Sequence, residues 1–147
     1  RWEDDNGGFL RLIAGNLPTQ LGEFSCVTAH LPGPLEQKLS DPVIIHGELS
    51  VNQQTSGSLE LPVSKGHNAF IYMIKDGLMI GDQALPGSSM AVLSPQTDCL
   101  DLRGKGAFLY VSAKPIGEPI AQMGPFVMNT RQELMQAVAD YQSGRLG

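Results

Sequence analysis

Short apolar runs separated by turn-forming residues are the feature that most limits how this chain can fold. Runs of about four to eight residues rich in Val, Ile, Leu, Phe and Tyr recur between clusters of Gly, Pro, Asn, Asp and Ser. Runs of this length suit β-strands, and the clusters supply the backbone conformations that tight turns require. The pattern therefore predicts an all-β sandwich or barrel.

Strand positions follow from the same pattern. We expect strands at Phe9–Ile13, Ser25–Ala29, Val43–Leu49, Ser58–Leu61, Ala69–Lys75, Leu78–Ile80, Met90–Ser94, Cys99–Leu102 and Phe108–Ala113. Asp76-Gly77 is the strongest hairpin signal, because a tight turn between twisted strands needs positive φ, which Asp and Gly tolerate. Gly104-Lys105-Gly106 is expected to be a hairpin turn rather than a phosphate-binding loop, which needs a longer glycine spacing and a Ser or Thr after Lys.

One helix is expected, near the C-terminal end. Thr130 and Glu133 fit a capping box, in which each side chain accepts a hydrogen bond from the other residue's backbone amide. Helical spacing then places four apolar side chains on one face: Leu134, Ala137, Val138 and Tyr141. Gly144 suits the left-handed residue that ends a helix, so the helix is predicted at Arg131–Ser143.

The composition is that of one soluble globular domain. A chain of 147 residues with 41% hydrophobic and 17% charged residues can bury a single core. Its net charge of -5 would repel a phosphate backbone, so we expect no direct nucleic-acid binding. Because the apolar stretches are too short to span a bilayer and no signal-peptide pattern is present, we expect a cytoplasmic protein without a membrane partner.

The first residues and the cysteines give two further expectations. Residues 1–8 are acidic and polar and are expected to form a linker, which leaves residues 9–147 as the folded domain. Cys26 and Cys99 have no CxxC spacing, and we expect two buried, reduced thiols. A single disulfide between them remains the alternative.

Residues near the C-terminus carry a family resemblance. The tripeptide Gly117-Glu118-Pro119 precedes the stretch Gly124-Pro125-Phe126-Val127-Met128-Asn129-Thr130 and then the expected helix. Upstream, Gly66–Ile74 followed by Gly77 and Gly81, together with Arg11–Gly15, completes a pattern that covers nearly the whole chain. This arrangement resembles the C-terminal half of the pirin family, most strongly from Pro115 to Gly144.

The resemblance implies a fold, a cofactor and a partner. Pirins are bicupins, in which an N-terminal β-barrel holds iron through three His and one Glu and the C-terminal barrel is metal-free. The family is associated with quercetin 2,3-dioxygenase activity and, in eukaryotic members, with transcriptional co-regulation. This chain is thus expected to be the second, cupin-like jelly-roll domain with a C-terminal α-helix, and the iron is expected in an N-terminal domain outside it.

The residues themselves form no familiar metal-binding or catalytic motif. A cupin metal motif places two His at alternate positions of one strand, but His67 is followed two positions later by Ala69. His30 and His46 are isolated in sequence, and no G-x-S-x-G nucleophile elbow is present. We therefore predict no catalytic residues, no metal ligands and no cofactor in this chain.

The C-terminal apolar residues are the candidate functional surface. Two interpretations remain open: these side chains pack into the core of their own domain, or they form an interdomain or partner surface. The partner would be the N-terminal cupin domain of the same protein or a second copy of the chain. The residues concerned are Phe126, Val127, Met128, Leu134, Val138 and Tyr141.

Three functional hypotheses follow. The first is a metal-free structural or interaction half that supports an iron-bearing cupin domain. The second is a portion of an iron-dependent quercetin 2,3-dioxygenase that contributes walls to its substrate cleft, although this chain alone is not expected to be catalytic. The third is a stand-alone barrel that binds a small ligand, since cupin interiors accommodate such molecules.

Overall fold

The chain divides into two compact units, and the division falls after Pro115. The computed structural model describes residues 1–145 apart from residues 4–6, 18–19, 22–23, 27–38 and 52–56. The first unit is Arg1–Pro115 and the second is Ile116–Gly147.

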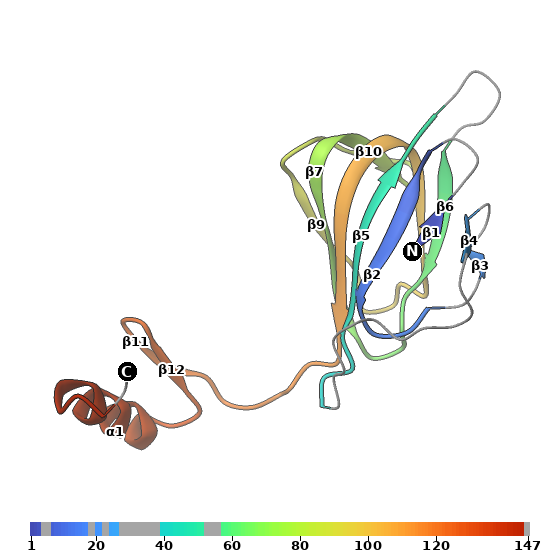
Figure 1. The fold of residues 1–147 in the computed structure, drawn as a ribbon. Coiled ribbons are helices and arrows are strands. Elements are labelled where there is room, and N and C mark those ends of the chain that lie inside the picture. The colour runs from blue at the N-terminus through green and yellow to red at the C-terminus, as the bar shows by residue number, and fades with distance from the viewer. Residues whose placement is uncertain (4–6, 18–19, 22–23, 27–38, 52–56, 146–147) are drawn as a thin grey trace. The chain divides into compact units, whose positions relative to one another are not determined.

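The first unit is built from antiparallel β-strands that curve around a common interior (Figure 1). Its strands are β1 (Trp2–Glu3), β2 (Phe9–Ala14), β3 (Gln20–Leu21), β4 (Phe24–Cys26), β5 (Val43–Leu49), β6 (Ser58–Pro62), β7 (Asn68–Ile80), β8 (Gln83–Leu85), β9 (Met90–Val92) and β10 (Cys99–Ala113). They pair in the order β3-β4-β1-β2-β5-β10-β7-β8, with β6 also on β10 and β9 also on β7. The predicted all-β fold is confirmed.

Alternation of buried and partly exposed residues fixes the inner face of the barrel. In β5 every second residue from Val43 to Leu49 is buried, because successive residues of a strand point to opposite faces of the sheet. The same alternation in the neighbouring strands fills the interior with aliphatic and aromatic side chains. The largest fully buried ones are Tyr110, Phe108, Leu10, Ile45, Leu49, Leu59, Leu61, Ile71, Met73, Leu100 and Leu102.

Both predicted hairpin turns are wrong, because each lies inside a long, bent strand. β7 runs through Asp76-Gly77 and β10 runs through Gly104-Lys105-Gly106, and the two segments pair with each other. Asp76 does have positive φ, at 58°, but here it bends a strand rather than reversing it. The ladder shifts register between Ala107 and Phe108, which marks a β-bulge at this bend.

Because of this bend, β10 pairs with strands in two parts of the barrel. Its residues Gly106–Ser112 pair with β5, whereas Cys99–Arg103 pair with β6. A Cβ on Gly106 would lie 2.9 Å from the Lys75 carbonyl oxygen, so the two bent strands approach too closely for a side chain there. In β-sandwiches, strands that bend and change their pairing partners form the corners between the two sheets.

The expected linker contains a short strand. Trp2 pairs with Leu10 of β2 and with Cys26 of β4, and Glu3 pairs with Phe9 and Ser25. A neighbouring strand edge can recruit a polar segment through backbone hydrogen bonds alone, which hydrophobic periodicity does not reveal. Of the expected strand Ser25–Ala29, residues 27–29 lie outside the described part of the chain.

The second unit combines a hairpin with the expected helix. β11 (Ala121–Met123) pairs with β12 (Phe126–Met128), and α1 spans Arg131–Gln142 with Ser143 as its C-cap. The predicted helix and capping box are confirmed, whereas the hairpin was not anticipated. Among the described residues, no helix is long and apolar enough to cross a membrane.

Candidate interaction surfaces

A small polar cluster lies at one end of the barrel interior. His67 and Ser112 are both buried, and Nδ1 of His67 shares a hydrogen bond of 2.9 Å with the Ser112 hydroxyl. On its other side, Nε2 of His67 lies 3.9 Å from a carboxylate oxygen of Asp41, which also pairs with Lys114 at 3.1 Å. Ser112 is 1% exposed, so a substrate in solution has no access to its hydroxyl. The cluster satisfies buried polar groups rather than forming a nucleophilic site.

Tyr110 adds a further buried polar group two residues before Ser112. Its hydroxyl has no hydrogen-bond partner among the described residues. Burial raises the pKa of the Tyr110 phenol, and the nearby Ser112 hydroxyl offsets part of this rise. A buried hydroxyl without a full hydrogen bond destabilises the fold, because water would have bonded it in the unfolded chain.

The two histidines in the described part of the chain, His46 and His67, do not lie together. His46 lies on the outward side of β5, where its ring meets the Phe9 ring edge-on at a centroid distance of 5.3 Å. His67 is buried on the other side of the sheet, and His30 lies outside the described residues. In the described part of the chain, no three side chains of the metal-binding types gather into one group.

The expectation of a buried thiol is wrong for Cys99. It is free but exposed, rather than buried. Partial burial raises the pKa of the Cys99 thiol, with further increases from the nearby carboxylates of Glu60 and Asp101. A raised pKa keeps the thiol protonated and therefore unreactive. The side chain of Cys26 is not described.

The outward side of the sheet carries two rows of apolar side chains. Strand register places these residues beside one another across neighbouring strands, since directly paired antiparallel residues lie on the same face. The first row contains Val92 of β9, Phe70 of β7, Val111 of β10 and Ile44 of β5. The second row contains Met90, Tyr72 and Leu109. We call these seven residues the outer apolar patch.

The patch is exposed at one edge and bordered by polar side chains at the other. Val92 is 73% exposed, Met90 57% and Tyr72 39%. Beyond Leu109 the second row continues to His46 on β5 and Arg11 on β2. This arrangement of an apolar centre with a polar margin is typical of protein interfaces.

The first residue of the chain lies beside this polar margin. The Arg1 guanidinium stacks over the Phe9 ring at 4.6 Å from its centroid, and the Phe9 ring contacts His46. Arg1 also pairs with Glu3 at 2.9 Å. Arg1 is therefore held on the same face of the sheet as the outer apolar patch.

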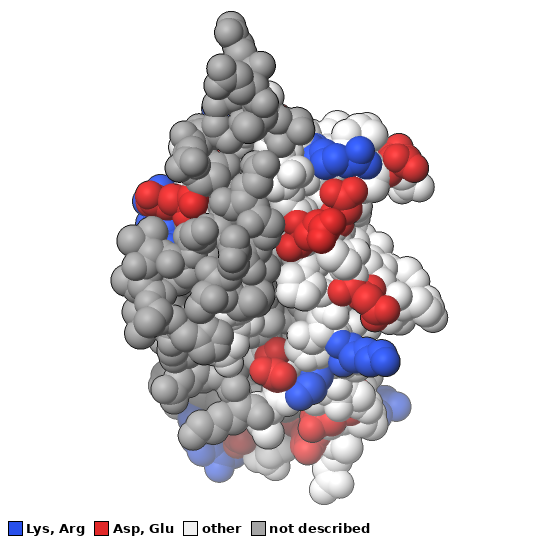
Figure 2. Space-filling view, turned by 90° about the vertical axis from the view of Figure 1, so that its right-hand side faces the viewer, with Lys and Arg blue, Asp and Glu red and all other residues white. Residues whose placement is uncertain are grey.

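Charged side chains of both signs are interspersed over another face of the molecule. Figure 2 shows Asp and Glu between Lys and Arg on its described part, without a basic stripe. Arg103 is an example, because it pairs with Asp101 at 3.3 Å and with Asp82 at 3.7 Å.

In the second unit, the structure divides the predicted surface residues into two groups. Leu134 is 4% exposed and packs inside its own unit together with Ala137. Phe126 contacts Tyr141 edge-on with ring centroids 5.8 Å apart, which ties β12 to α1. Phe126, Met128 and Val138 are half-buried, whereas Val127 and Tyr141 are 56% and 63% exposed.

Signature residues of the second unit hold one another in place. The Asn129 side-chain amide donates a hydrogen bond of 2.7 Å to Glu118, which joins the GEP tripeptide to the GPFVMNT stretch. The Glu133 carboxylate accepts from the backbone amides of Thr130 at 2.8 Å and Asn129 at 3.1 Å. Thr130 in turn accepts from the Glu133 amide at 3.2 Å. These contacts fix the start of α1.

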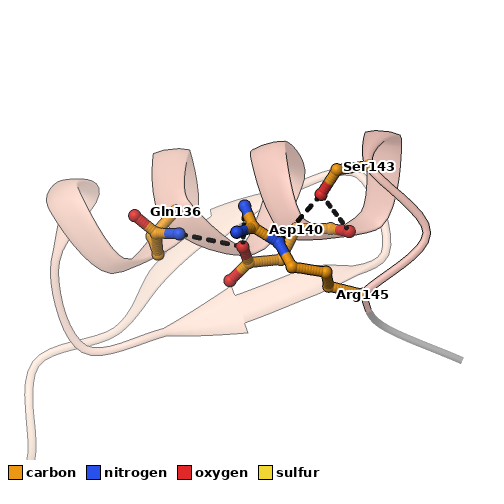
Figure 3. A network of polar contacts seen from close by, with 4 residues as sticks. All are labelled: Gln136, Asp140, Ser143 and Arg145. Carbon is orange, nitrogen blue, oxygen red and sulfur yellow. Dashed lines mark hydrogen bonds and ion pairs between the residues drawn. The ribbon is translucent and has the colours of Figure 1, made fainter.

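The end of α1 is closed by a second set of contacts. The Arg145 amide donates to the Asp140 carbonyl and the Gly144 amide to the Tyr141 carbonyl, with Gly144 at a φ of 73°. This is a Schellman motif, so the predicted role of Gly144 is confirmed. Asp140 also accepts from Gln136 at 2.9 Å and pairs with Arg145 at 2.7 Å, as Figure 3 shows.

A shallow hollow of about 330 Å³ lies between the hairpin and the helix of the second unit. It is apolar apart from one Arg and one Gln side chain. Its lining residues are Ala121, Gln122, Met123, Arg131, Leu134 and Met135. Met123 and Met135 are 42% and 58% exposed, so the hollow is part of an exposed apolar surface.

Together, the antiparallel barrel, its apolar interior and the C-terminal helix define a cupin-type domain. The family model of the pirin C-terminal cupin domain matches residues 48–147. The chain therefore belongs to the pirin family and corresponds to its C-terminal cupin domain.

Relatives and solved structures agree with this assignment. The chain is 31% identical, over 144 residues, to a Thermoplasma acidophilum protein named "putative quercetin 2,3-dioxygenase", covering 97% of the chain and 52% of that protein. It is 35% identical over 94 residues to Pirin of Mus musculus, covering 58% of the chain and 32% of that protein. A crystal structure of quercetin 2,3-dioxygenase from Acinetobacter baumannii superposes with a TM-score of 0.77 at 30% identity, covering 98% of the chain and 46% of that structure. The chain thus spans about half the length, or less, of these relatives.

The outer apolar patch is the surface that sequence reasoning missed. The signal was present in Ala69–Ile74, an apolar run without the alternation of a strand that faces water on one side. Such runs are typical of strands covered on both faces. The predicted surface residues, by contrast, all lie in the second unit.

Proposed function

We propose that this chain is the supporting half of a two-cupin protein and that its partner is an iron-bearing N-terminal cupin domain. In this arrangement the chain supplies structure and contact surface, and the chemistry belongs to the other half. The proposal goes beyond the family assignment, because the chain covers only part of each relative.

One observation carries this proposal: the inner face of the barrel is filled with apolar side chains. Ile71, Met73 and Phe108 point inward from the two central strands, and each is fully buried. A metal ion inside a barrel needs His or carboxylate side chains at such inward positions. The central strands use these positions for packing instead.

The described residues do not fit an iron site. His67, the buried histidine, is occupied by Ser112 on one ring nitrogen and faces Asp41 on the other. His46 lies on the outward side of the sheet and cannot join it. We therefore assign no step of any iron chemistry to this chain.

A second candidate function is supported by the names of the relatives. Proteins named as quercetin 2,3-dioxygenases match nearly the whole chain. In such a parent protein this domain would contribute walls to the substrate cleft without contributing ligands. A third candidate, a stand-alone ligand-binding barrel, has less support because the described interior is filled by the apolar core.

A cytoplasmic location is also part of the proposal. Cys99 is a free thiol, and reduced thiols persist where disulfides are kept reduced. Localisation of a tagged full-length protein by fractionation tests this point. Recovery in an oxidising compartment would contradict it.

The main test compares this chain with the longer protein in which an N-terminal cupin domain precedes it. Iron content and oxygen consumption with quercetin are measured for both, with Fe(II) supplied. We expect iron in the longer protein and neither stoichiometric iron nor turnover in the chain alone. Turnover by the chain on the order of 1 per second, or one iron per chain that is lost in His67→Ala, would contradict the proposal.

The same measurement separates the first two candidates. Quercetin-dependent oxygen uptake by the longer protein supports a dioxygenase in which this chain borders the cleft. Iron without such uptake supports the structural and interaction role alone.

A further inference from the structure

Strand β9 (Met90–Val92) lies at an open edge of the barrel sheet, as Figure 1 shows. It pairs with β7 on one side, and among the described residues no strand pairs with its other side. Its two outward side chains are well exposed, with Met90 57% and Val92 73% exposed. An unpaired edge presents a row of backbone donors and acceptors, which is a template for another strand.

The register of β9 on β7 determines which backbone groups face this edge. The Leu93 amide donates a hydrogen bond of 2.9 Å to the Ala69 carbonyl of β7. Hydrogen-bonded and non-hydrogen-bonded pairs alternate along an antiparallel ladder, so Val92 and Met90 both fall in pairs that exchange no hydrogen bond with β7. The N–H and C=O groups of Met90 and Val92 therefore point toward the open edge.

These groups fit a second copy of the same strand. When two β9 strands pair antiparallel about a two-fold axis at Ala91, Met90 of each copy lies opposite Val92 of the other. Both residues have their backbone groups turned to the edge, so each such pair can exchange both of its N–H···O bonds. The two Ala91 residues then form a non-hydrogen-bonded pair, in which the Cα atoms lie about 4.5 Å apart and a small side chain fits easily.

The outer side chains of β9 are also complementary to those of a second copy. Val92 lies beside Phe70 and Met90 beside Tyr72, in the two rows of the outer apolar patch. The pairing of Met90 with Val92 joins each row of one copy to the other row of its partner. Apolar side chains then lie directly opposite apolar side chains, which stabilises a pair of strands.

The segment around β9 carries no charge that would oppose this pairing. Residues 83–97 contain no Asp, Glu, Lys or Arg, although the chain has a net charge of -5. Charged edge residues are a usual device against pairing between molecules, and they are missing here. Pro86 and Pro95 bound the segment, and because Pro cannot donate to a ladder, they confine pairing to the residues between them. The contact is therefore short, and a two-fold axis closes it at two copies.

We propose that β9 is a dimerisation edge, at which two copies of this chain join their sheets by antiparallel pairing about Ala91. Because the contact is small, the dimer should dissociate on dilution. The inference adds a second copy as a partner and does not depend on the proposed function. The C-terminal residues singled out from the sequence lie in the other unit.

Sedimentation velocity of the chain over a dilution series measures this association. Val92→Pro removes an N–H group that faces the edge, and it removes no hydrogen bond to β7. The dissociation constant of the dimer should rise about tenfold or more, because each copy loses one intermolecular bond. Val92→Thr is the matched control, since it keeps the amide and a strand-favouring side chain and should change the constant much less. Circular dichroism checks that both variants keep their β structure.

Disulfide formation across the axis is the second measurement. Ala91→Cys is made in a background of Cys26→Ser and Cys99→Ser and treated with oxidised glutathione. The two thiols at position 91 should lie directly opposite each other in a closely spaced pair, which suits a disulfide. Val92→Cys is the control, because the two positions 92 are diagonal neighbours about 7–8 Å apart. Non-reducing gels should show the cross-linked dimer forming several-fold faster at position 91, although position 92 is the more exposed of the two.

Each outcome decides for or against the inference. A monomer at every concentration overturns it, and so does cross-linking that is as fast at position 92 as at position 91. A dimer that survives Val92→Pro but is lost in Tyr72→Ser would place the contact on the outer face of the sheet and would also overturn it. If Val92→Pro unfolds, the cross-linking rates decide alone. None of these results depends on iron or oxygen uptake, so the proposed function is judged separately by its own test.

Discussion

At the scale of single residues, the spacing of the histidines along the chain does not reveal their contacts. No second His follows two positions after His67, so the spacing predicts no cupin-type pair of metal ligands there. The actual partner of His67 is Ser112, 45 residues away, and no local pattern links them. Contacts of this kind depend on strand register, which one sequence does not determine.

Tyr110 gives a prediction at this scale. Tyr110→Phe removes a hydroxyl that is buried without a hydrogen-bond partner among the described residues, and it keeps the ring that fills the core. We expect the free energy of unfolding to stay the same or rise by up to about 1 kcal/mol. Urea unfolding monitored by circular dichroism measures it. Tyr141→Phe, at an exposed tyrosine, is the control and should change little.

The same substitution predicts a pH dependence. Burial raises the pKa of the Tyr110 phenol above its usual 10.0, so the unfolded chain loses this proton at lower pH than the folded chain. The contribution to stability is fully present below pH 10.0 and is lost as pH rises toward the raised value. Wild-type stability should therefore fall more steeply above that pH than that of Tyr110→Phe. Parallel curves would show that Tyr110 does not titrate differently on folding.

At the scale of elements, the helix was predictable and the bent strands were not. The capping box, the apolar face and the terminating glycine of α1 all lie within 15 consecutive residues, from Thr130 to Gly144. In contrast, Asp76-Gly77 and Gly104-Lys105-Gly106 have the composition of turns. Each bends without reversing because it pairs with the other across β7 and β10. That pairing is a tertiary effect, and it overrides the local preference.

Thr130→Ala tests the start of the helix. Loss of the hydroxyl leaves the Glu133 amide without its capping acceptor, which should lower the helix stability by about 1 kcal/mol. The measurement is the thermal loss of helical signal in circular dichroism. Gln132→Ala in the same turn is the control and should leave the signal unchanged or slightly higher, since Ala favours helix. Equal melting of both variants would contradict a capping role.

Gly106→Ala tests the bend between β7 and β10. The added Cβ would lie 2.9 Å from the Lys75 carbonyl oxygen and 3.0 Å from the terminal carbon of Met73. Overpacking of this kind should lower the free energy of unfolding by about 1–3 kcal/mol. Gly66→Ala gives the comparison, because Gly66 has positive φ but open space around it. A smaller loss at Gly106 than at Gly66 would mean that the strands separate easily there.

At the scale of the whole molecule, the sequence predicted one domain over residues 9–147, and the structure has two compact units. The family resemblance gave the barrel and the helix together, but it carried no information about how independent they are. All residues of the described core cluster lie between Leu10 and Tyr110, within the first unit. Leu134 and Ala137 are buried in the second unit. Each unit therefore has buried residues of its own.

This division predicts that residues 1–115 fold without residues 116–147. The shortened chain keeps every strand from β1 to β10 and the whole described core cluster, so it should unfold cooperatively with a midpoint within a few degrees of the full chain. Residues 116–147 alone have a two-stranded hairpin and one 12-residue helix, which is too little to bury a stable core, and should lose their helical signal. Thermal circular dichroism of both fragments and of the full chain decides the matter. An unfolded fragment 1–115 would mean that the second unit is required to complete the barrel.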